Sequence, residues 1–554
     1  MTVEAVCRGQ PRFDPPSVSL LPDDVLATWR ERLERLGPRA AAASARGDFA
    51  VGLRDEQGRT FLCVDRFAVR SLCWRQVGDE LRFAERADLL ADADTPIDPQ
   101  AIFDYLYFHV IPSPRTIYRG IHRLPPGHYA WFEGGRMTIE PYWLPEFGAD
   151  PAPSVADAKE EFRALLQQAV RRQLDGGKAA CFLSGGTDSS TVAGVIGQVA
   201  GRPAATYSIG FEAEGYDEMA FARTTARHFG TEHHEYYVTP EDLVASMAQV
   251  AAAYDQPFGN SSVLPAYYCA RMARADGVTR LLAGDGGDEL FGGNTRYAKQ
   301  RVFGLYDGVP APLRRGLLEP ALSGAWVDRV PGLKKGKSYI EQARVPLPDR
   351  MQMYNLLRRL GPEQVFTPAM RHAVDDDAPL RAQREVWAQP RHAGALDRQL
   401  AFDWRYTLAE CDLPKVCGST ALAGVGVGFP LLDQDLVDFS MRLPPSYKLR
   451  GLKLRWFFKE ALRGFLPDAT ITKRKQGFGL PFGVWATRHA ALRRLADDAL
   501  HSLGQRGIVD AGFMRRLMEE HLGAHPGYYG EMVWLLTMLE LWLQAHAPGY
   551  RISD

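Results

Sequence analysis

Short apolar runs alternate with amphipathic stretches through the central part of the chain. The runs KAACFL (178–183), AATYSIGF (204–211) and TRLLAG (279–284) have the length of buried strands. Residues 155–174 and the stretch TVAGVIGQVAG (191–201) place apolar side chains at helical spacing, and the second of these ends on a glycine. This alternation predicts a parallel β-sheet that is covered by helices on both faces.

The patterns on either side of this region differ from it. Beyond about Asn294 the pattern is mostly helical, so we expect the sheet to carry a helical extension. Before a Pro- and Ala-rich linker (145–157), residues 30–46 have helical character and several strand-like runs are joined by turns. These runs are FAVGLRD (49–55), TFLCVDRF (60–67) and LRFAER (81–86). We predict a small α+β domain over residues 1–148 and an α/β domain over 155–550.

Composition narrows the classes of function. The 554 residues carry a net charge of −1 with 24% charged residues, which speaks against a nucleic-acid or anionic-membrane partner. The seven cysteines are scattered and no pair has C-x-x-C spacing, which disfavours zinc and disulfide frameworks and favours a reducing cytoplasm. The N-terminus has no apolar signal region, and no apolar run reaches the roughly 18 residues of a membrane span.

The stretch SGGTDSS (184–190) lies between a predicted strand and a predicted helix. Its glycines free backbone N–H groups that can point at a phosphate, and the helix N-terminus favours negative charge. Three serines add hydroxyl donors, and Asp188 fits such a site if it holds a divalent metal that bridges it to phosphate. The Walker pattern G-x-x-x-x-G-K-[ST] is absent. The alternative is an ordinary turn with a polar helix cap.

A second acidic cluster follows another predicted strand. In LLAGDGGDELFGG (281–293), Asp285, Asp288 and Glu289 lie among glycines that let the backbone approach a ligand closely. Carboxylates are the oxygen ligands that Mg²⁺ prefers. The alternatives are an acidic surface turn or a calcium loop, although the calcium-loop spacing does not fit.

At this point the chain resembles a known family. SGGTDSS resembles the pyrophosphate-binding loop of ATP pyrophosphatases, and the order and spacing of further motifs resemble class B asparagine synthetases. Those motifs are YSIGF (207–211), GDGGDELFGG (284–293), FPLLD (429–433) and KRKQGFGLPF (473–482), with 47–74 similar to the end of the family's glutaminase domain and 97–132 to its domain junction. The resemblance implies an N-terminal Ntn-hydrolase-like αββα sandwich. It also implies a C-terminal ATP-pyrophosphatase domain (adenine nucleotide alpha hydrolase-like), with a parallel sheet and a helical extension.

The resemblance also implies a mechanism that uses ATP and Mg²⁺. A carboxylate attacks the α-phosphate of ATP, pyrophosphate leaves, and an amine attacks the acyl-adenylate. Pyrophosphate and Mg²⁺ would be held by Ser184, Gly185, Gly186, Asp188 and Ser189, with Asp288 as the second Mg²⁺ carboxylate. The adenosine pocket would be lined by Leu183, Ile209, Ala283 and Gly284, and Asp285 would face the acyl-adenylate and the incoming amine.

Lys475 matches a family lysine that neutralises charge developing on the phosphates and the tetrahedral intermediate. The alternative is that Lys473, Arg474 and Lys475 form a solvated basic run. The apolar loop QGFGLPF that follows would be costly to leave exposed, which favours the catalytic role.

The first departure from the family concerns its glutaminase. The family uses a cysteine nucleophile directly after the initiator Met, where this chain has Thr2, and the R-G-P-D and N-G-E-I-Y-N segments of the glutamine pocket have no match. Thr2 could act as a nucleophile only if Met1 were removed, and Cys7 lies too far inside the chain to use the α-amine. We therefore expect no glutaminase activity, and a first domain that is a structural relic or a docking surface.

The second departure lies between Lys415 and Asp433. The family pattern K-x-D-R-x-S/T-M-x-x-x-x-E-x-R-x-P-F-L-D is here KVCGSTALAGVGVGFPLLD, so four charged positions become Cys417, Gly418, Gly426 and Gly428. Removing both members of a buried ion pair together can be nearly neutral. We expect the glycines to widen the acyl pocket, so that it prefers a larger or less polar acid than aspartate. The alternative is that this segment packs against the sheet. Asn260, where the family usually has Asp, is a lesser change.

Three functions remain open. The first is an ATP-dependent, amide-forming ligase without its own glutaminase, acting on small-molecule, peptide or carrier-bound acids and amines. The amine could belong to the substrate itself, as in the β-lactam synthetases and lasso-peptide cyclases, which also lack the cysteine. The second is an asparagine synthetase that uses ammonia, and the third is a non-catalytic nucleotide-binding or scaffold protein. The pattern leaves a homodimer open.

Overall fold

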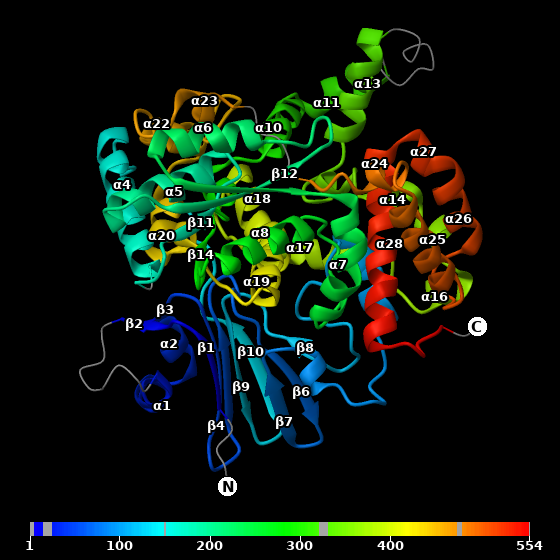
Figure 1. Ribbon diagram of the computed structural model, residues 1–554, viewed down its shortest axis with the longest axis horizontal. Helices are drawn as coiled ribbons and strands as arrows, with labels where there is room; N and C mark the ends of the chain where they lie inside the picture. Colours follow the sequence, from blue (N-terminus) through cyan, green and yellow to red (C-terminus); the bar gives the residue numbers. More distant parts are fainter. Residues whose placement is uncertain are drawn as a thin grey trace.

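The computed structural model of the chain describes residues 5–14, 25–148, 151–174, 176–320, 331–473 and 479–552. Its first part contains two antiparallel sheets, which lie below the rest of the molecule in Figure 1. The larger sheet has the order β1-β4-β5-β9-β10 and the smaller sheet β7-β6-β8. Their strands are β1 (Ala5–Gly9), β4 (Phe49–Arg54), β5 (Thr60–Val64), β6 (Cys73–Val77), β7 (Glu80–Ala84), β8 (His122–Arg123), β9 (His128–Glu133) and β10 (Arg136–Pro141).

Helices cover one face of the larger sheet. Helix α1 (Val25–Leu36) buries Trp29 against Phe49 and Phe61 of the larger sheet. On the opposite face of that sheet, Leu62 shares a hydrophobic core with Phe83 of the smaller sheet. Helix α2 (Pro38–Ala43) and a short ribbon, β2 (Arg12–Phe13) with β3 (Ala45–Arg46), complete this layer. The helical pattern predicted for 30–46 is thus divided into two helices and a strand.

A five-stranded parallel sheet forms the centre of the second part. Its order is β13-β12-β11-β14-β15, and every neighbouring pair is parallel. The strands are β11 (Ala180–Phe182), β12 (Ala205–Phe211), β13 (Glu232–Val238), β14 (Arg280–Leu282) and β15 (Gly426–Gly428). The three apolar runs are strands, as predicted. The edge strand β13 has polar side chains and was not predicted.

Helices cover both faces of this sheet, because successive side chains of a strand point to opposite sides. Cys181 and Leu282 join the hydrophobic core of one face, whereas Ala180 and Leu281 join that of the other. The first face carries α4 (Val155–Gln173), α5 (Thr187–Ala200), α6 (Met219–Phe229), α20 (Gln434–Arg442) and α22 (Trp456–Ala461). The second carries α7 (Pro240–Ala253), α8 (Val263–Ala275) and α28 (Pro526–His546). This confirms the predicted doubly covered sheet.

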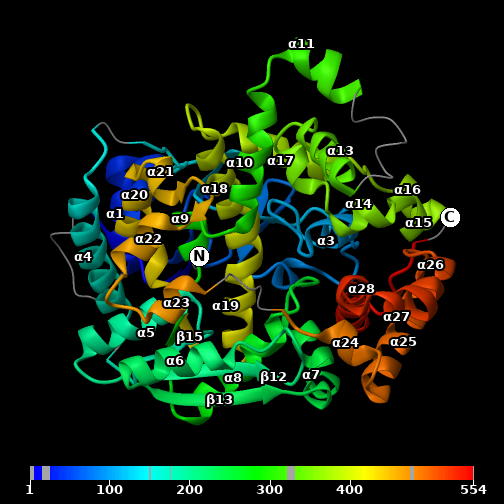
Figure 2. The ribbon, with the colours of Figure 1, turned by 90° about the horizontal axis from the view of Figure 1, so that it is seen from above.

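The remainder is mostly helical, as predicted. Figure 2 shows α28 with α24–α27 grouped on the side of the sheet away from α4 and α22. The other described α-helices are α3 (Pro99–Phe108), α9 (Gly287–Phe291), α10 (Thr295–Asp307), α11 (Ala311–Leu313), α13 (Pro331–Ala343), α14 (Leu356–Leu360), α15 (Pro362–Val365), α16 (Pro368–His372), α17 (Ala378–Ala388), α18 (Ala395–Asp403), α19 (Leu413–Leu422), α21 (Pro445–Lys448), α23 (Asp468–Thr472), α24 (Phe482–Ala486), α25 (Ala490–Gly504), α26 (Ala511–Arg516) and α27 (Leu522–Ala524). The π-helix η5 (Trp404–Asp412) precedes α19. Every described helix is too short or too polar to span a bilayer.

Candidate functional site

The first glycine-rich loop connects β11 to α5. Gly185 has a φ of 71°, which residues with a side chain rarely adopt, and a Cβ there would lie 2.4 Å from the backbone N of Ala222 in α6. The N–H of Ser184 donates to the hydroxyl of Ser189, and the two hydroxyls are 3.1 Å apart. Hydroxyl groups and the N-terminal amides of α5 therefore meet at the carboxyl end of β11, an arrangement that suits an anion.

The second loop, between β14 and α9, lies directly against the first. A Cβ on Gly284 would be 2.7 Å from the backbone N of Ser189, and one on Gly287 would be 2.2 Å from Oδ1 of Asp188. Only glycine permits these approaches, so the glycines let the two loops interlock. The interlocking brings the carboxylates of Asp188 and Asp288, a hundred residues apart, to one place.

Both carboxylates pair with one buried cation, Arg455. Its Nη1 lies 2.9 Å from Oδ1 of Asp288 and donates to Oγ1 of Thr187 at 2.7 Å, while its Nη2 pairs with Asp188. The residue is 6% exposed and has a φ of 54° at the start of α22. Burial lowers its pKa, but the charges of Asp188 and Asp288 outweigh burial and raise that pKa above its usual value.

This arrangement fits a divalent cation. Mg²⁺ is typically bound by one or two carboxylates together with phosphate oxygens and water. Asp188, in the first turn of α5, and Asp288, in the first turn of α9, supply two carboxylates that meet at Arg455. These two residues could therefore hold Mg²⁺ beside the guanidinium.

A second charged cluster adjoins Asp285, which lies three residues after the end of β14. Lys415 of α19 places its Nζ 3.1 Å from Oδ1 of Asp412 and 3.7 Å from Oδ1 of Asp285. Burial lowers the pKa of Lys415, but the two carboxylates raise it above its ordinary value, so the lysine stays charged. Burial raises the pKa of Asp285, although Lys415 opposes this shift. Asn260 donates to Oδ1 of Asp412 at 3.5 Å.

The residues expected to line an adenosine pocket are divided between the two faces of the sheet. Leu183 and Ala283 are buried together in the core beneath α5, beside Gly284. Ile209 belongs to the core of the opposite face. In a parallel sheet a ligand lies beyond the ends of the strands, where side chains of both faces can reach it. Two predicted residues, Lys475 and Thr2, lie outside the described residues.

Two of the three glycines that replace family charges, Gly418 and Gly428, leave no open space. A Cβ on Gly418 would lie 2.3 Å from the hydroxyl of Tyr254, which donates to the carbonyl of Lys415 at 3.2 Å. A Cβ on Gly428 would lie 2.4 Å from Oε1 of Gln173. At these two positions the expectation of a widened pocket was wrong, because the side chains of Tyr254 and Gln173 fill the space. Gly428 lies in β15, so this segment does pack against the sheet.

Sequence reasoning missed Arg455, Asp412 and Tyr254, and it assigned no role to Lys415. A retained lysine in a motif that had lost its other charges was a usable signal for Lys415. No local pattern marks Arg455 or Tyr254, since their partners lie far away in the sequence.

Two family models together match most of this chain. The family model for asparagine synthase matches residues 161–544, and that for the glutamine amidotransferase domain matches residues 28–143. The chain is 27% identical to a Mycobacterium tuberculosis protein named as a glutamine-hydrolysing asparagine synthetase, over 90% of this chain and 76% of that protein. It is 24% identical to glutamine-hydrolysing asparagine synthetase 1 of Bacillus subtilis (94% and 80% covered) and 24% identical to an amidase of Gibberella zeae (79% and 70%).

Proposed function

We infer that this chain, which belongs to the asparagine synthase family, adenylates a carboxylate with ATP, releases pyrophosphate and joins the acyl group to an amine. Family membership makes it an ATP-dependent amide-forming ligase with the two-domain fold expected from the sequence. The observation that carries the finer proposal is the convergence of Asp188 and Asp288 from two interlocked loops on one cation.

The nucleotide end of the proposed site is built from the first loop and Arg455. The hydroxyls of Ser184 and Ser189, with the amides of Gly185 and Gly186, would hold the pyrophosphate group. Bound Mg²⁺ would neutralise phosphate charge and polarise the phosphoryl oxygens. The Arg455 guanidinium, paired with Asp188 beside this loop, would supply further positive charge to offset the negative charge that develops on the leaving group.

The chemistry at the other end requires a base. The acid's carboxylate oxygen attacks the α-phosphorus and breaks its bond to the bridging oxygen of pyrophosphate. The amine nitrogen then attacks the acyl carbon, AMP leaves with the former carboxylate oxygen, and the amine loses a proton. Asp285 is the proposed acceptor of that proton, because burial raises its pKa and Lys415 holds it in place. Lys475 remains the proposed cation for the tetrahedral intermediate.

We propose that the chain does not take its amine from glutamine. The family's nucleophile position is Thr2 in this chain, and the match to the amidotransferase family begins only at residue 28. Two sources of the amine fit this proposal. It could be a free amine or ammonia, or it could belong to the acid itself, in which case the reaction closes a ring.

A second candidate is an asparagine synthetase that uses ammonia. Lys415 supports it, because a fixed cation beside Asp285 can hold the spare carboxylate of aspartate, which would be costly to bury unpaired. The names of the M. tuberculosis and B. subtilis relatives point the same way.

Pyrophosphate release with Mg²⁺ and ATP tests these proposals. The wild-type chain would be assayed with aspartate and with larger amino-acid and acyl substrates, each with and without ammonium. Acid-dependent release supports the ligase, and a wide preference for aspartate with ammonium supports the second candidate. Nucleotide binding without release for any acid would refute both. In the same assay Asp188→Ala, which removes one of the two proposed Mg²⁺ ligands, should lose pyrophosphate release. Asp94→Ala, which removes an exposed carboxylate of the first part, is its control.

A further inference from the structure

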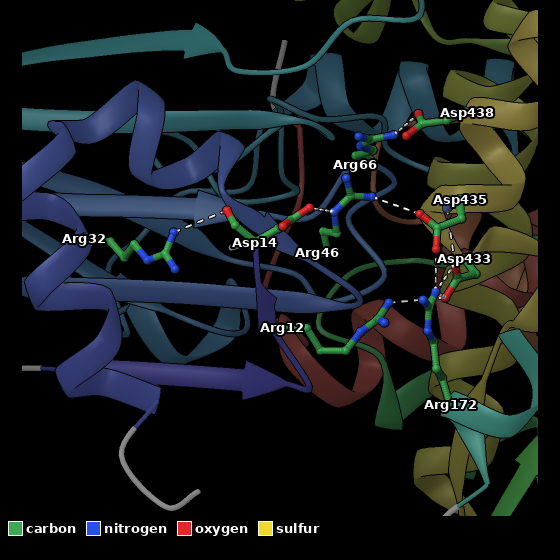
Figure 3. Close-up of polar contacts among 9 residues, drawn as sticks. All are labelled: Arg12, Asp14, Arg32, Arg46, Arg66, Arg172, Asp433, Asp435 and Asp438. Atoms are coloured by element: carbon green, nitrogen blue, oxygen red, sulfur yellow. Dashed lines mark hydrogen bonds and ion pairs between the residues drawn. The ribbon is translucent and has the colours of Figure 1, made fainter. Parts of the chain in front are cut away.

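Arginines of the first part of the chain hold the start of helix α20 in the second part. Asp433 is the N-cap of α20, and its Oδ2 accepts a hydrogen bond from Nη2 of Arg12 at 3.2 Å. Oδ1 of Asp435 accepts a hydrogen bond from Nη1 of Arg46 at 3.1 Å. Arg172, at the end of α4, donates to both carboxylates, at 2.9 and 2.7 Å. Figure 3 shows these side chains meeting between the two parts of the chain. We call these five residues the α20 clamp.

The clamp explains an otherwise unfavourable pairing in the β2–β3 ribbon. Arg12 and Arg46 are directly opposite each other across the two strands, and like charges in that position destabilise a strand pair. The carboxylates of Asp433 and Asp435, with Asp14 on the other side of Arg46, compensate both charges. The two arginines of the ribbon thus form ion pairs with carboxylates of the second part of the chain.

The clamp lies one residue from a contact with the second acidic loop. Leu432 directly precedes Asp433, and its Cδ2 would be 2.3 Å from a Cβ on Gly286. Gly286 directly follows Asp285, and Asp288 lies two residues further on. A second link lies alongside, where the N–H of Ala283 donates to the carbonyl of Gly428 at 2.8 Å. Movement of Asp433 would therefore move the side chain on which the acidic loop rests.

We propose that Arg12 and Arg46 are positioning residues of the first domain, which hold Leu432 against Gly286 through the α20 clamp and so fix the acidic loop that carries Asp285 and Asp288. A domain without glutaminase activity then still has a task in the ligase. The coupling concerns the loop itself, and only its consequence for Mg²⁺ and ATP rests on the proposed function.

The chain offers a matched control on the same helix. Asp438 also pairs across the two parts of the chain, with Nη1 of Arg66 at 2.5 Å, and its side chain is exposed to a similar extent as that of Asp435. It lies five residues beyond Asp433, so its loss weakens the contact between the parts without touching Leu432. Asp435→Asn and Asp438→Asn therefore separate loop positioning from simple adhesion.

Hydrogen–deuterium exchange of the amides at 283–291 in the full chain is the primary measurement. We expect exchange there to be about three- to tenfold faster in Asp435→Asn and unchanged in Asp438→Asn. Exchange in Arg46→Gln should be accelerated as much as in Asp435→Asn. If Asp435→Asn fails to fold, Arg46→Gln still tests the clamp from the side of the first domain. The Mg²⁺ concentration that half-saturates pyrophosphate release should rise by a similar factor.

The results that would overturn the inference are specific. Equal exchange in the wild type and Asp435→Asn would show that the clamp does not position the loop. Equal acceleration in Asp435→Asn and Asp438→Asn would show that these pairs only join the domains. A wild-type chain that releases no pyrophosphate would remove the proposed ligase function, whereas the exchange comparison would still decide the positioning role.

Discussion

Replacing Arg455 by Met removes a buried positive charge that two carboxylates, Asp188 and Asp288, share. Breaking a buried ion pair from one side typically costs about 3–5 kcal/mol, because the remaining charge is left uncompensated. Arg455 is 6% exposed, so solvent screens this loss little. Unfolding entropy is about 2 cal/mol/K per residue, or roughly 0.8 kcal/mol/K over residues 161–544. The melting temperature should therefore fall by roughly 4–6 °C.

Mg²⁺ provides the diagnostic part of this experiment. In Arg455→Met, Asp188 and Asp288 lose the guanidinium that both of them contact, so Mg²⁺ alone should stabilise the variant more than the wild type. At a hundred times its Kd the ion would restore about 2.7 kcal/mol. Thermal melting with and without Mg²⁺ measures both effects, and Arg463→Met, which removes an exposed pair with Glu460, should melt like the wild type. The reasoning would be refuted if Arg455→Met melted at the wild-type temperature, or if Mg²⁺ raised its melting temperature no more than that of the wild type.

Three further predictions concern the proposed chemistry and the packing around it. Asp188→Ala should lower pyrophosphate release by about a hundredfold or more while the circular dichroism spectrum stays unchanged; wild-type turnover would remove the adenylation proposal. Glutamine should not be hydrolysed, and ATP-coupled glutamate formation that Thr2→Ala abolishes would contradict this. Gly418→Ala should destabilise the chain by about 1–3 kcal/mol, because its Cβ meets the Tyr254 hydroxyl. Chemical denaturation measures that effect, and a neutral result would show that Tyr254 moves aside freely.

The sheet was predictable where its strands are buried on both faces. Such strands are largely apolar, so β11, β12 and β14 appear in the sequence as short, mostly hydrophobic runs. Strand β13 has the sequence EHHEYYV at the edge of the sheet, where water replaces a neighbouring strand and polar side chains are tolerated. Polarity there is a property of position in the sheet, which only the assembled topology defines.

The glycine-rich loops of the candidate site could be predicted from the sequence, but the buried arginine that contacts them could not. Gly185 and Asp188 stand within one short motif, since a loop that binds an anion needs these residue types close together in sequence. Arg455 contacts that loop from 267 residues away, within the stretch LKLRWFFKE, where an arginine resembles any surface cation. Tyr254 fills the space above Gly418 in the same non-local way. A glycine in a sequence shows that a side chain is missing, but it does not show what occupies its place.

The cluster beside Asp285 sets the charge that a substrate meets. Lys415 lies between two carboxylates, so the row of Asp285, Lys415 and Asp412 carries a net charge of −1, and each member is only partly buried. A spare carboxylate on the acid can pair only with the central lysine, whereas an ammonium group can pair with either aspartate. A zwitterionic amino acid supplies both partners, while a plain dicarboxylic acid adds a second negative charge to a site that is already negative. Aspartate should therefore exceed succinate in acid-dependent pyrophosphate release, and Lys415→Met should narrow the gap by weakening aspartate. Equal rates with the two acids would show that this cluster does not contact the substrate.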